Sequence, residues 1–161
     1  MPDLLPFYES ATFAFLDIET TGGSAGSDRI TEIGIRFWRD GETIGQWQTL
    51  INPERRISAF IEQLTGINNE MVRQAPVFEE IADELQEQLE GKIFVAHNAR
   101  FDYGFIKSEF RALGRLFSAK VLCTVKLSRL LYPEHRRHNM DSLIARHGLD
   151  QVERHRAMGD V

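Results

Sequence analysis

Two carboxylate residues, Asp17 and Glu19, lie two positions apart where a short apolar run, residues 12–18, comes to an end. If that run is a β-strand, both side chains project from one face while Ile18 turns into the core. Two like charges side by side destabilise each other unless they share a cation or a proton. Acidic residues at strand ends are often only solvated. This pair by itself is therefore no more than a candidate for cation binding.

A third acid, Asp102, follows the segment His97-Asn98-Ala99-Arg100-Phe101. The apolar run at 93–96 predicts a buried strand that leads directly into a helix, with Asn98 as its capping residue. In the first turns of that helix a carboxylate also interacts favourably with the helix dipole, whatever its other role. The preceding strand places Asp102 at the rim of the sheet, where it can approach the end of the first strand.

The remaining candidates are His155 and Asp160, which are five residues apart near the end of the sequence. This separation is slightly more than one helical turn, so a helix that begins here can direct both side chains to one cavity. A lone His–Asp pair is usually a surface interaction. Together with the three acids above, it completes a set of four carboxylates and one histidine. Carboxylate oxygens suit hard cations such as Mg²⁺ better than zinc.

The elements that must position these residues begin with three strands. After residues 12–18 and a turn at 20–23, residues 30–38 predict a second strand with alternating apolar side chains. The Asp40-Gly41 dipeptide is a hairpin turn signal, and residues 43–51 supply a third strand. Three sequential strands joined by short turns are expected to be antiparallel neighbours.

The pattern after residue 52 is helical. Ser58 can cap a short helix through Leu64, and apolar residues recur at helical spacing from 78 to 89. The later elements are expected as a strand at 93–96, a helix after Asn98, a strand near 120–123, and helices near 125–131 and 140–147. A strand meander followed by alternating helices and strands predicts an α/β fold, a mixed sheet with helices on its faces.

Composition limits the class of protein. The chain has 161 residues, of which 42% are hydrophobic and 27% charged, as in a single soluble globular domain. A net charge of −5 argues against coating nucleic acid through a broad basic face, but not against gripping one strand end. The single Cys123 excludes an internal disulfide and a thiolate zinc site. No stretch has the form of a signal peptide or a membrane span, which predicts a cytoplasmic protein without membrane contact.

Three segments of the sequence resemble the motifs of a known family. Asp17-Ile18-Glu19-Thr20-Thr21-Gly22, His97-Asn98-Ala99-x-Phe101-Asp102 and His155-x-Ala157-x-x-Asp160 are similar, in order and separation, to the motifs of the DnaQ-like (DEDDh) 3′–5′ exonucleases, such as the exonuclease domain of the DNA polymerase III epsilon proofreading subunit. Residues 30–34 and 64–67 resemble further family segments. The resemblance covers residues 12–161, after a lead-in at 1–11. It implies a ribonuclease-H-like fold with a mixed five-stranded sheet, three antiparallel strands plus two parallel ones.

The resemblance also implies an activity, the hydrolysis of nucleotides from DNA 3′ ends in proofreading or repair, with two Mg²⁺ or Mn²⁺ ions. Asp17 would bridge both ions, and Glu19 and Asp160 would hold the ion that binds the water. Asp102 would act through the shell of the second ion, and His155 would take the proton from the water. The implied partners are a single-stranded 3′ end and a DNA polymerase or a fused nuclease module.

Substrate contacts are a further implication of the resemblance. The backbone of residues 20–22 would receive the terminal 3′ hydroxyl, and apolar side chains would bracket the last base without reading its identity. The predicted contacts are Thr20, Thr21, Gly22, Leu64, Thr65, Asn98 and Phe101. Leu64 and Phe101 fit a hydrophobic core equally well, and Asn98 fits a helix cap.

Several alternatives stay open. Asp160 is followed only by Val161, whereas the family motif begins a longer helix, so we expect an excerpt of a longer protein or a missing last helix. A domain of this fold could serve chiefly to dock nucleic acid or protein, although docking needs no catalytic residues. An RNA-trimming enzyme is the other alternative, because no residue clearly reads a 2′-hydroxyl. The segment at 136–138 is either a solvated loop or a phosphate contact.

Overall fold

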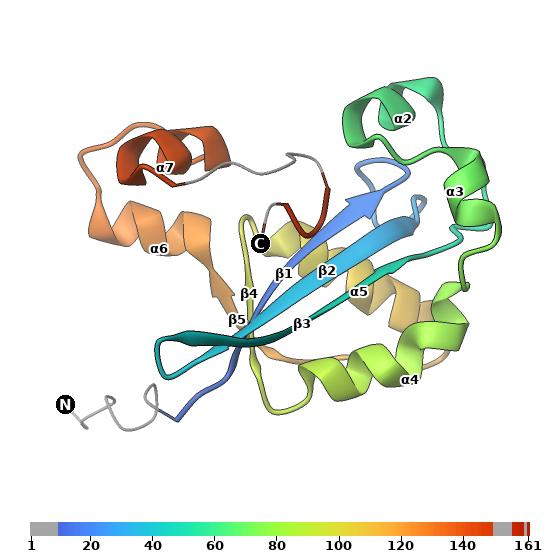
Figure 1. Cartoon of the computed structure of the whole chain (residues 1–161), viewed down its shortest axis with the longest axis horizontal. Coiled ribbons are helices and arrows are strands. Elements are labelled where there is room, and N and C mark those ends of the chain that lie inside the picture. The colour runs from blue at the N-terminus through green and yellow to red at the C-terminus, as the bar shows by residue number, and fades with distance from the viewer. Residues whose placement is uncertain (1–9, 150–155, 160) are drawn as a thin grey trace.

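A five-stranded mixed sheet forms the centre of the computed structural model, which describes residues 10–149, 156–159 and 161 (Figure 1). The strand order is β3-β2-β1-β4-β5. β1 (Phe13–Thr20), β2 (Ile30–Arg39) and β3 (Glu42–Leu50) form the antiparallel meander. β4 (Ile93–Ala96) pairs in parallel with β1, and β5 (Lys120–Cys123) pairs in parallel with β4. The predicted arrangement of three antiparallel and two parallel strands is confirmed.

The helices predicted between residues 58 and 147 are present. The helices are α2 (Ala59–Thr65), α3 (Asn69–Arg73), α4 (Phe78–Leu89), α5 (Arg100–Ala112), α6 (Thr124–Leu131) and α7 (Met140–His147). Ser58 caps α2 as expected, because its side chain accepts the amide of Ile61. The sequence did not predict α3, whose five residues are too few to show a helical period. None of the described helices combines the length and apolar composition needed to cross a membrane.

The main hydrophobic core lies between one face of the sheet and two helices, α4 and α5. Alternate residues of β1, among them Ile18, are buried on this face, as the period-2 pattern requires. The largest contributors to the core are Leu16, Ile33, Ile35, Phe78, Leu85, Phe105, Ile106 and Phe110. This packing fixes β1 rigidly and directs its other side chains to the opposite face.

A buried ion pair also joins the start of β2 to α5. The carboxylate of Glu109 accepts two hydrogen bonds from Arg29 Nε, at 2.9 and 3.1 Å. It also accepts the backbone amide of Ile30 at 3.3 Å. A buried carboxylate is tolerated only when it is paired and hydrogen-bonded in this way.

The opposite face of the sheet is covered in part by a distant segment of the chain. Residues 156–159, dark red in Figure 1, lie over β1 and β2. Ala157 is fully buried there. This covered face is the one from which Asp17 and Glu19 project.

Candidate active site

Asp17 and Glu19 occupy one face of β1, as predicted, and both are half-buried. In the antiparallel register Asp17 is opposite Gly34 of β2, and Glu19 is opposite Glu32. Residues opposite each other in an antiparallel pair project from the same face. Glu19 therefore has a second carboxylate as its cross-strand neighbour.

Asp102 lies in the first turn of α5 and contacts the end of β1. Its carboxylate accepts a hydrogen bond from the backbone amide of Ile18, the residue between Asp17 and Glu19. The side chain is only 2% exposed. Burial raises the pKa of Asp102 to about 7, although hydrogen bonds from the amides of Asp102 and Ile18 oppose this rise. Asp102 thus lies against the end of β1 that carries Asp17 and Glu19, as the sequence predicted for the rim of the sheet.

The third motif is described only between its two predicted catalytic residues. His155 and Asp160 lie outside the described residues, so their predicted roles rest on the sequence. Arg156 and Ala157 are described, and both bind Glu32. Arg156 donates two hydrogen bonds to the Glu32 carboxylate, at 2.7 and 3.1 Å, and the amide of Ala157 donates a third at 2.9 Å.

Glu32 was not among the predicted site residues. It is 0% exposed, and Gln48 Nε2 donates a further hydrogen bond to it at 3.0 Å. Burial alone would raise the pKa of Glu32, but the hydrogen bonds from Arg156, Ala157 and Gln48 outweigh burial and hold that pKa below its usual value. The sequence contained one signal for the role of Glu32: it is a charged residue inside a predicted strand that is otherwise largely apolar.

The donor chemistry at the end of β1 fits a hard divalent cation. Asp17, Glu19 and Asp102 supply only oxygen ligands, and a cation nearby would favour the ionised form of Asp102, whose pKa burial raises to about 7. Among the residues that the structure describes, however, no three His, Cys, Asp or Glu side chains are close enough to hold an ion. Asp160, the fourth predicted ligand, is not among them.

The loop after β1 contains the predicted receptor for a 3′ hydroxyl. The Thr20 hydroxyl donates to the Gly22 carbonyl at 2.6 Å, and the Thr21 amide donates to the Arg29 carbonyl at 2.9 Å. A Cβ on Gly22 would lie 2.6 Å from the carboxylate of Asp28. That carboxylate accepts the Ser24 amide at 3.0 Å and the Thr21 hydroxyl at 3.3 Å. The loop is therefore shaped by internal hydrogen bonds that leave no room for a side chain at Gly22.

Leu64 and Thr65, at the end of α2, differ in their exposure to solvent. Leu64 is 44% exposed, so its core alternative is wrong and an accessible apolar side chain is available. Thr65 is buried, and its hydroxyl donates to the Ile61 carbonyl and accepts the Ile67 amide. The Thr65 side chain therefore ends the helix, and its contact with a substrate stays a prediction. Phe60, one helical turn before Leu64, is 71% exposed and was not predicted as a contact.

Asn98 does not cap α5, which corrects the sequence interpretation. The cap residue is Ala99, without a side-chain hydrogen bond, and Asn98 has a φ of 63°. The sharp turn from β4 into α5 needs a left-handed residue, a conformation that Asn adopts more readily than most. Asn98 and Phe101 line a pocket that loop residues 23–25 close from the other side. Phe101 also packs on Phe105, with ring centroids 4.9 Å apart.

Residues 14–161 match the exonuclease family model (RNase_T). The chain belongs to this exonuclease family. It is 38% identical over 150 residues to the 3′–5′ exonuclease DinG of Staphylococcus saprophyticus and 40% identical over 149 residues to the PolC-type DNA polymerase III of Caldanaerobacter subterraneus. Both alignments cover 92% of this chain, but only 17% of the first relative and 11% of the second. The chain thus spans a small part of the length of these relatives.

Solved exonucleases have a similar fold. Exonuclease X in complex with 5′-overhanging duplex DNA aligns with a TM-score of 0.75 and 26% identity, over 92% of this chain and 83% of that one. Exonuclease I aligns with a TM-score of 0.82 and 18% identity, over 94% of this chain and 39% of that one. A zinc-bound form of the Escherichia coli exonuclease I complex with single-stranded DNA is also similar, with a TM-score of 0.82, 19% identity, and coverage of 94% of this chain and 38% of that one. These similarities confirm the ribonuclease-H-like architecture that the resemblance implied.

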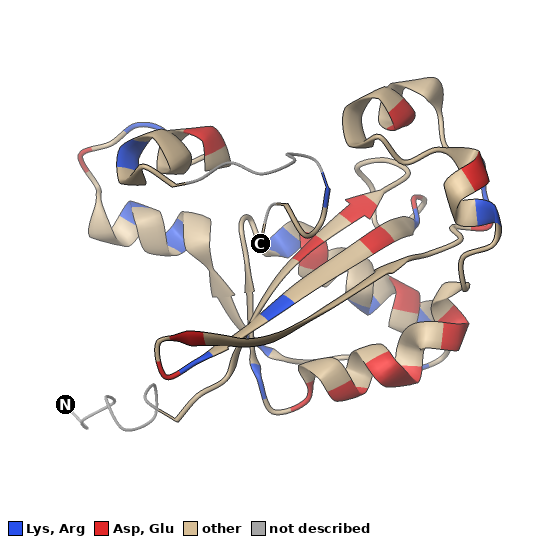
Figure 2. Cartoon of the chain, viewed as in Figure 1, with Lys and Arg blue, Asp and Glu red and all other residues tan. Residues whose placement is uncertain are grey.

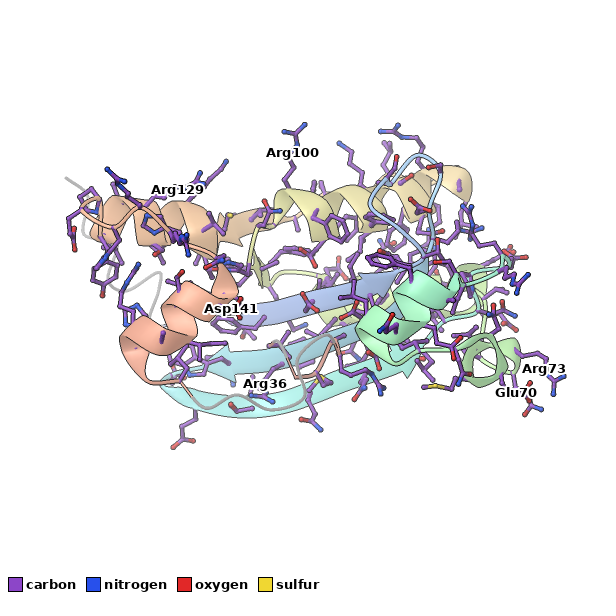
Figure 3. The ribbon with its side chains drawn as sticks, turned by 90° about the horizontal axis from the view of Figure 1, so that it is seen from above. Arg36, Glu70, Arg73, Arg100, Arg129 and Asp141 are labelled. Atoms are coloured by element: carbon purple, nitrogen blue, oxygen red, sulfur yellow. The ribbon has the colours of Figure 1, made fainter. Side chains whose placement is uncertain are left out.

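Histidines near the exonuclease motifs have structural partners. His97 Nδ1 is 2.9 Å from Thr124 Oγ1, so this ring is hydrogen-bonded at the end of β4. His138, in the basic segment at 136–138, is buried between the Ser128 hydroxyl and the His135 carbonyl, so this part of the segment is not a solvated loop. Basic residues also mark α6 (Figure 2), and Arg129 there extends away from the sheet, as does Arg100 of α5 (Figure 3). A phosphate contact by Arg136 or Arg137 stays a prediction.

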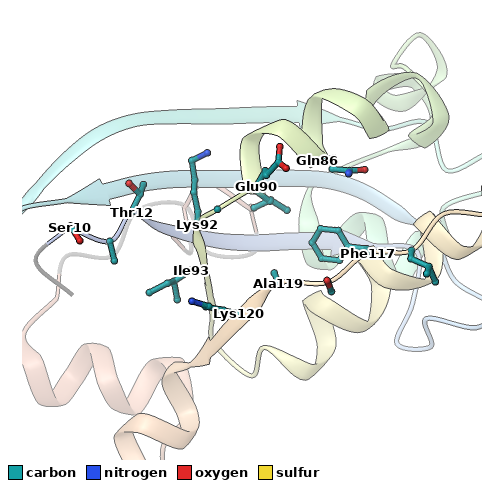
Figure 4. Close-up of a pocket in the computed structure, with 14 residues that line it drawn as sticks. Ser10, Thr12, Gln86, Glu90, Lys92, Ile93, Phe117, Ala119 and Lys120 are labelled. Atoms are coloured by element: carbon teal, nitrogen blue, oxygen red, sulfur yellow. The ribbon is translucent and has the colours of Figure 1, made fainter. Parts of the chain in front are cut away.

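A broad pocket lies at the opposite end of β1 from the carboxylates. It is lined by Thr12 and Ile93, where β1 and β4 begin, and by Lys92, Phe117 and Lys120 (Figure 4). Of the predicted catalytic and substrate-binding residues that the structure describes, none borders it. The described acids of the exonuclease motifs lie instead at the other end of β1.

Proposed function

We propose that this chain is a metal-dependent exonuclease that removes nucleotides from DNA 3′ ends, in proofreading or repair. The observation that supports the proposal is the contact between Asp102 and the amide of Ile18, the residue between Asp17 and Glu19. The names of the DinG and PolC-type relatives favour 3′–5′ polarity and a DNA substrate. The exonuclease X complex with duplex DNA also favours DNA.

The cofactors we infer are two Mg²⁺ or Mn²⁺ ions, held by Asp17, Glu19, Asp102 and Asp160. When bound, such ions activate a water molecule and stabilise the leaving 3′ oxygen. Asp17 would contact both ions, and Asp102 would lose its proton as its ion binds. His155 would accept the proton of the attacking water.

An exposed leucine and a half-buried phenylalanine near the carboxylates suit a single-stranded 3′ end. Leu64 on α2 and Phe101 on α5 would hold the terminal base by apolar contact, which reads no base identity. The hydrogen-bonded loop at 20–22 would receive the terminal 3′ hydroxyl. The PolC-type relatives favour a DNA polymerase as the partner of this activity, and a fused nuclease module is the alternative. We expect the chain to act in the cytoplasm.

A cleavage assay tests the proposal. Single-stranded DNA and RNA oligonucleotides of one sequence, labelled at the 3′ or the 5′ end, are incubated with Mg²⁺, with Mn²⁺ or with EDTA. The wild type and Asp17→Ala are compared with Glu87→Ala, which removes an exposed carboxylate on α4. We expect 5′-labelled DNA to shorten one nucleotide at a time with either metal, and no cleavage in EDTA or by Asp17→Ala.

Each condition of the cleavage assay distinguishes the proposal from one alternative. Cleavage in EDTA, or equal cleavage by Asp17→Ala, would refute the metal mechanism. Faster degradation of RNA than of DNA would indicate an RNA-trimming enzyme. Binding of the oligonucleotide without cleavage under every condition would indicate a docking domain. Glu87→Ala should behave as the wild type, because α4 packs on the other face of the sheet.

A further inference from the structure

Glu32 is a carboxylate withdrawn completely from solvent, yet it does not belong to the predicted catalytic set. A charge in this position is tolerated only if every oxygen is hydrogen-bonded. Three of its four hydrogen bonds come from one short segment, two from Arg156 and one from the Ala157 amide. The fourth comes from Gln48 on β3. Glu32 therefore binds a segment that is 124 residues away in sequence.

Gly34, two residues further along β2, provides a second point of attachment. A Cβ at this position would lie 2.8 Å from the Ala157 carbonyl carbon and 2.8 Å from the Met158 nitrogen. These are backbone atoms, which cannot rotate away as the tip of a side chain can. The backbone at 157–158 thus rests directly on β2, in a space that exists only because residue 34 is glycine.

The two attachment points are the cross-strand partners of the two acids of β1. Glu32 is opposite Glu19, and Gly34 is opposite Asp17. Opposite residues in an antiparallel pair have Cβ atoms about 4.5–5.5 Å apart. In sequence, His155 comes directly before the bound segment, and Asp160 follows it closely. The contacts with β2 therefore hold the middle of the third motif, residues 156–158, on the strand next to Asp17 and Glu19.

We propose that Glu32 is a positioning residue for the hydrolytic reaction. It holds Arg156 and Ala157 on β2, with Gly34 as the seat for their backbone, and so sets the third motif against Asp17 and Glu19. It touches neither substrate nor cation itself. This inference rests on the proposed function. It adds to the site the residue that joins the third motif, at 155–160, to the first, at 17–22.

A purely structural role for the same ion pair makes a different prediction. Such a pair would affect folding and leave the turnover of the folded enzyme nearly unchanged. The chain contains a matched control for this alternative, the buried Arg29–Glu109 pair. It also has two arginine hydrogen bonds and one backbone amide on a buried carboxylate, but it joins β2 to α5 and not to the third motif.

The test compares Glu32→Gln, Arg156→Gln and their double variant with Glu109→Gln. We measure kcat and KM on a 3′-ended DNA oligonucleotide with Mn²⁺, the melting temperature, and hydrogen exchange of the Ala157 amide. A misplacement of about 1 Å in a catalytic group can lower turnover about 100-fold, so we expect a 10- to 100-fold loss of kcat in Glu32→Gln with KM changed less than about threefold. Arg156→Gln should lose as much kcat as Glu32→Gln. The double variant should have a kcat no lower than that of the less active single variant, because both changes break the same contact.

Hydrogen exchange provides a measurement that does not depend on activity. The Ala157 amide should exchange faster in Glu32→Gln and stay protected in Glu109→Gln. Glu109→Gln should lower the melting temperature to a similar extent while kcat stays within about threefold of the wild type. A Glu32→Gln enzyme with wild-type kcat, or a kcat loss equal to that of Glu109→Gln, would overturn the proposal.

Two further variants guard against loss of folding. Gly34→Ala changes neither Glu32 nor Arg156 but forces the 157–158 backbone away from β2, and we expect it also to lower kcat more than it raises KM. Gly45→Ala is its control, because a Cβ there meets only Phe37 at an ordinary distance of 3.7 Å. If the wild type cleaves nothing, the proposed function fails. The Ala157 exchange rate then still decides whether Glu32 holds the segment, and unchanged protection in Glu32→Gln would refute it.

Discussion

The carboxylate of Asp102 accepts a hydrogen bond from the backbone amide of Ile18. This contact joins the first turn of α5 to the end of β1 at the one residue that separates Asp17 from Glu19. Ile18 itself points into the core, so the position of its amide is fixed by the packing of β1. The contact therefore places a buried carboxyl group at a defined point beside two others.

The cost of burying Asp102 should be visible in stability. Its pKa is about 7 in the folded chain and near its ordinary 3.8 in the unfolded chain, so between these values the folded state binds more protons. Stability falls as pH rises from about 4 to 7, and the full penalty is present above pH 7. We expect metal-free Asp102→Asn to be more stable than the wild type at pH 8, by about 1–3 kcal/mol, and nearly equal to it at pH 4.

Urea unfolding in EDTA at the two pH values measures this difference. Mn²⁺ should then reverse the order at pH 8, because an ion that binds the folded wild type stabilises it. Asp102→Asn should also lose cleavage activity. A variant that is less stable than the wild type at pH 8 in EDTA would show that burial does not raise the pKa of Asp102.

His155→Ala separates proton transfer from metal binding. Loss of a general base typically lowers kcat about 100- to 10,000-fold, and we expect a loss in this range. Calorimetric Mn²⁺ affinity should stay close to the wild-type value. His135→Ala, which removes an exposed histidine after α6, is the control and should change neither quantity. Loss of Mn²⁺ binding in His155→Ala would contradict the general-base role.

Gly22→Ala tests the shape of the loop after β1. The added methyl group would lie 2.6 Å from the Asp28 carboxylate, which holds Thr21 and Ser24. We expect KM for a 3′-ended oligonucleotide to rise about tenfold, because moving the loop costs hydrogen bonds of about 1 kcal/mol each. Gly23→Ala is the neighbouring control, since a Cβ there meets nothing within 4 Å. Equal KM values for the two variants would remove the loop from the binding site.

The exposed apolar pair on α2 should contribute to binding of the 3′ end. Phe60 and Leu64 are one turn apart on the same helical face. We expect Leu64→Ala and Phe60→Ala each to weaken binding about tenfold, within the range seen when a stacking side chain is removed, without lowering the melting temperature. Fluorescence anisotropy with a labelled oligonucleotide measures the affinity. Leu116→Ala, at a 96% exposed leucine that borders the other pocket, should bind as the wild type does.

Local sequence patterns determined most of the secondary structure. The alternation of apolar residues in β1 and β2 fixed which side chains enter the core, and so placed Asp17 and Glu19 together on the other face. The strand-to-helix junction at 96–100 was enough to bring Asp102 to the rim of the sheet. The same junction did not reveal the conformation of Asn98, because a left-handed turn and a helix cap favour the same residue type.

Only the tertiary structure decided the roles of Glu32, Gly34 and Thr65. In sequence, Glu32 is one polar residue at an alternate strand position, which is normally solvated. It is buried because a segment from the far end of the chain covers β2 and supplies its hydrogen bonds. Periodicity and spacing report the geometry of neighbours along the chain. Burial and pairing of a polar group depend instead on which distant backbone comes to lie against it, and the packed sheet alone determines that.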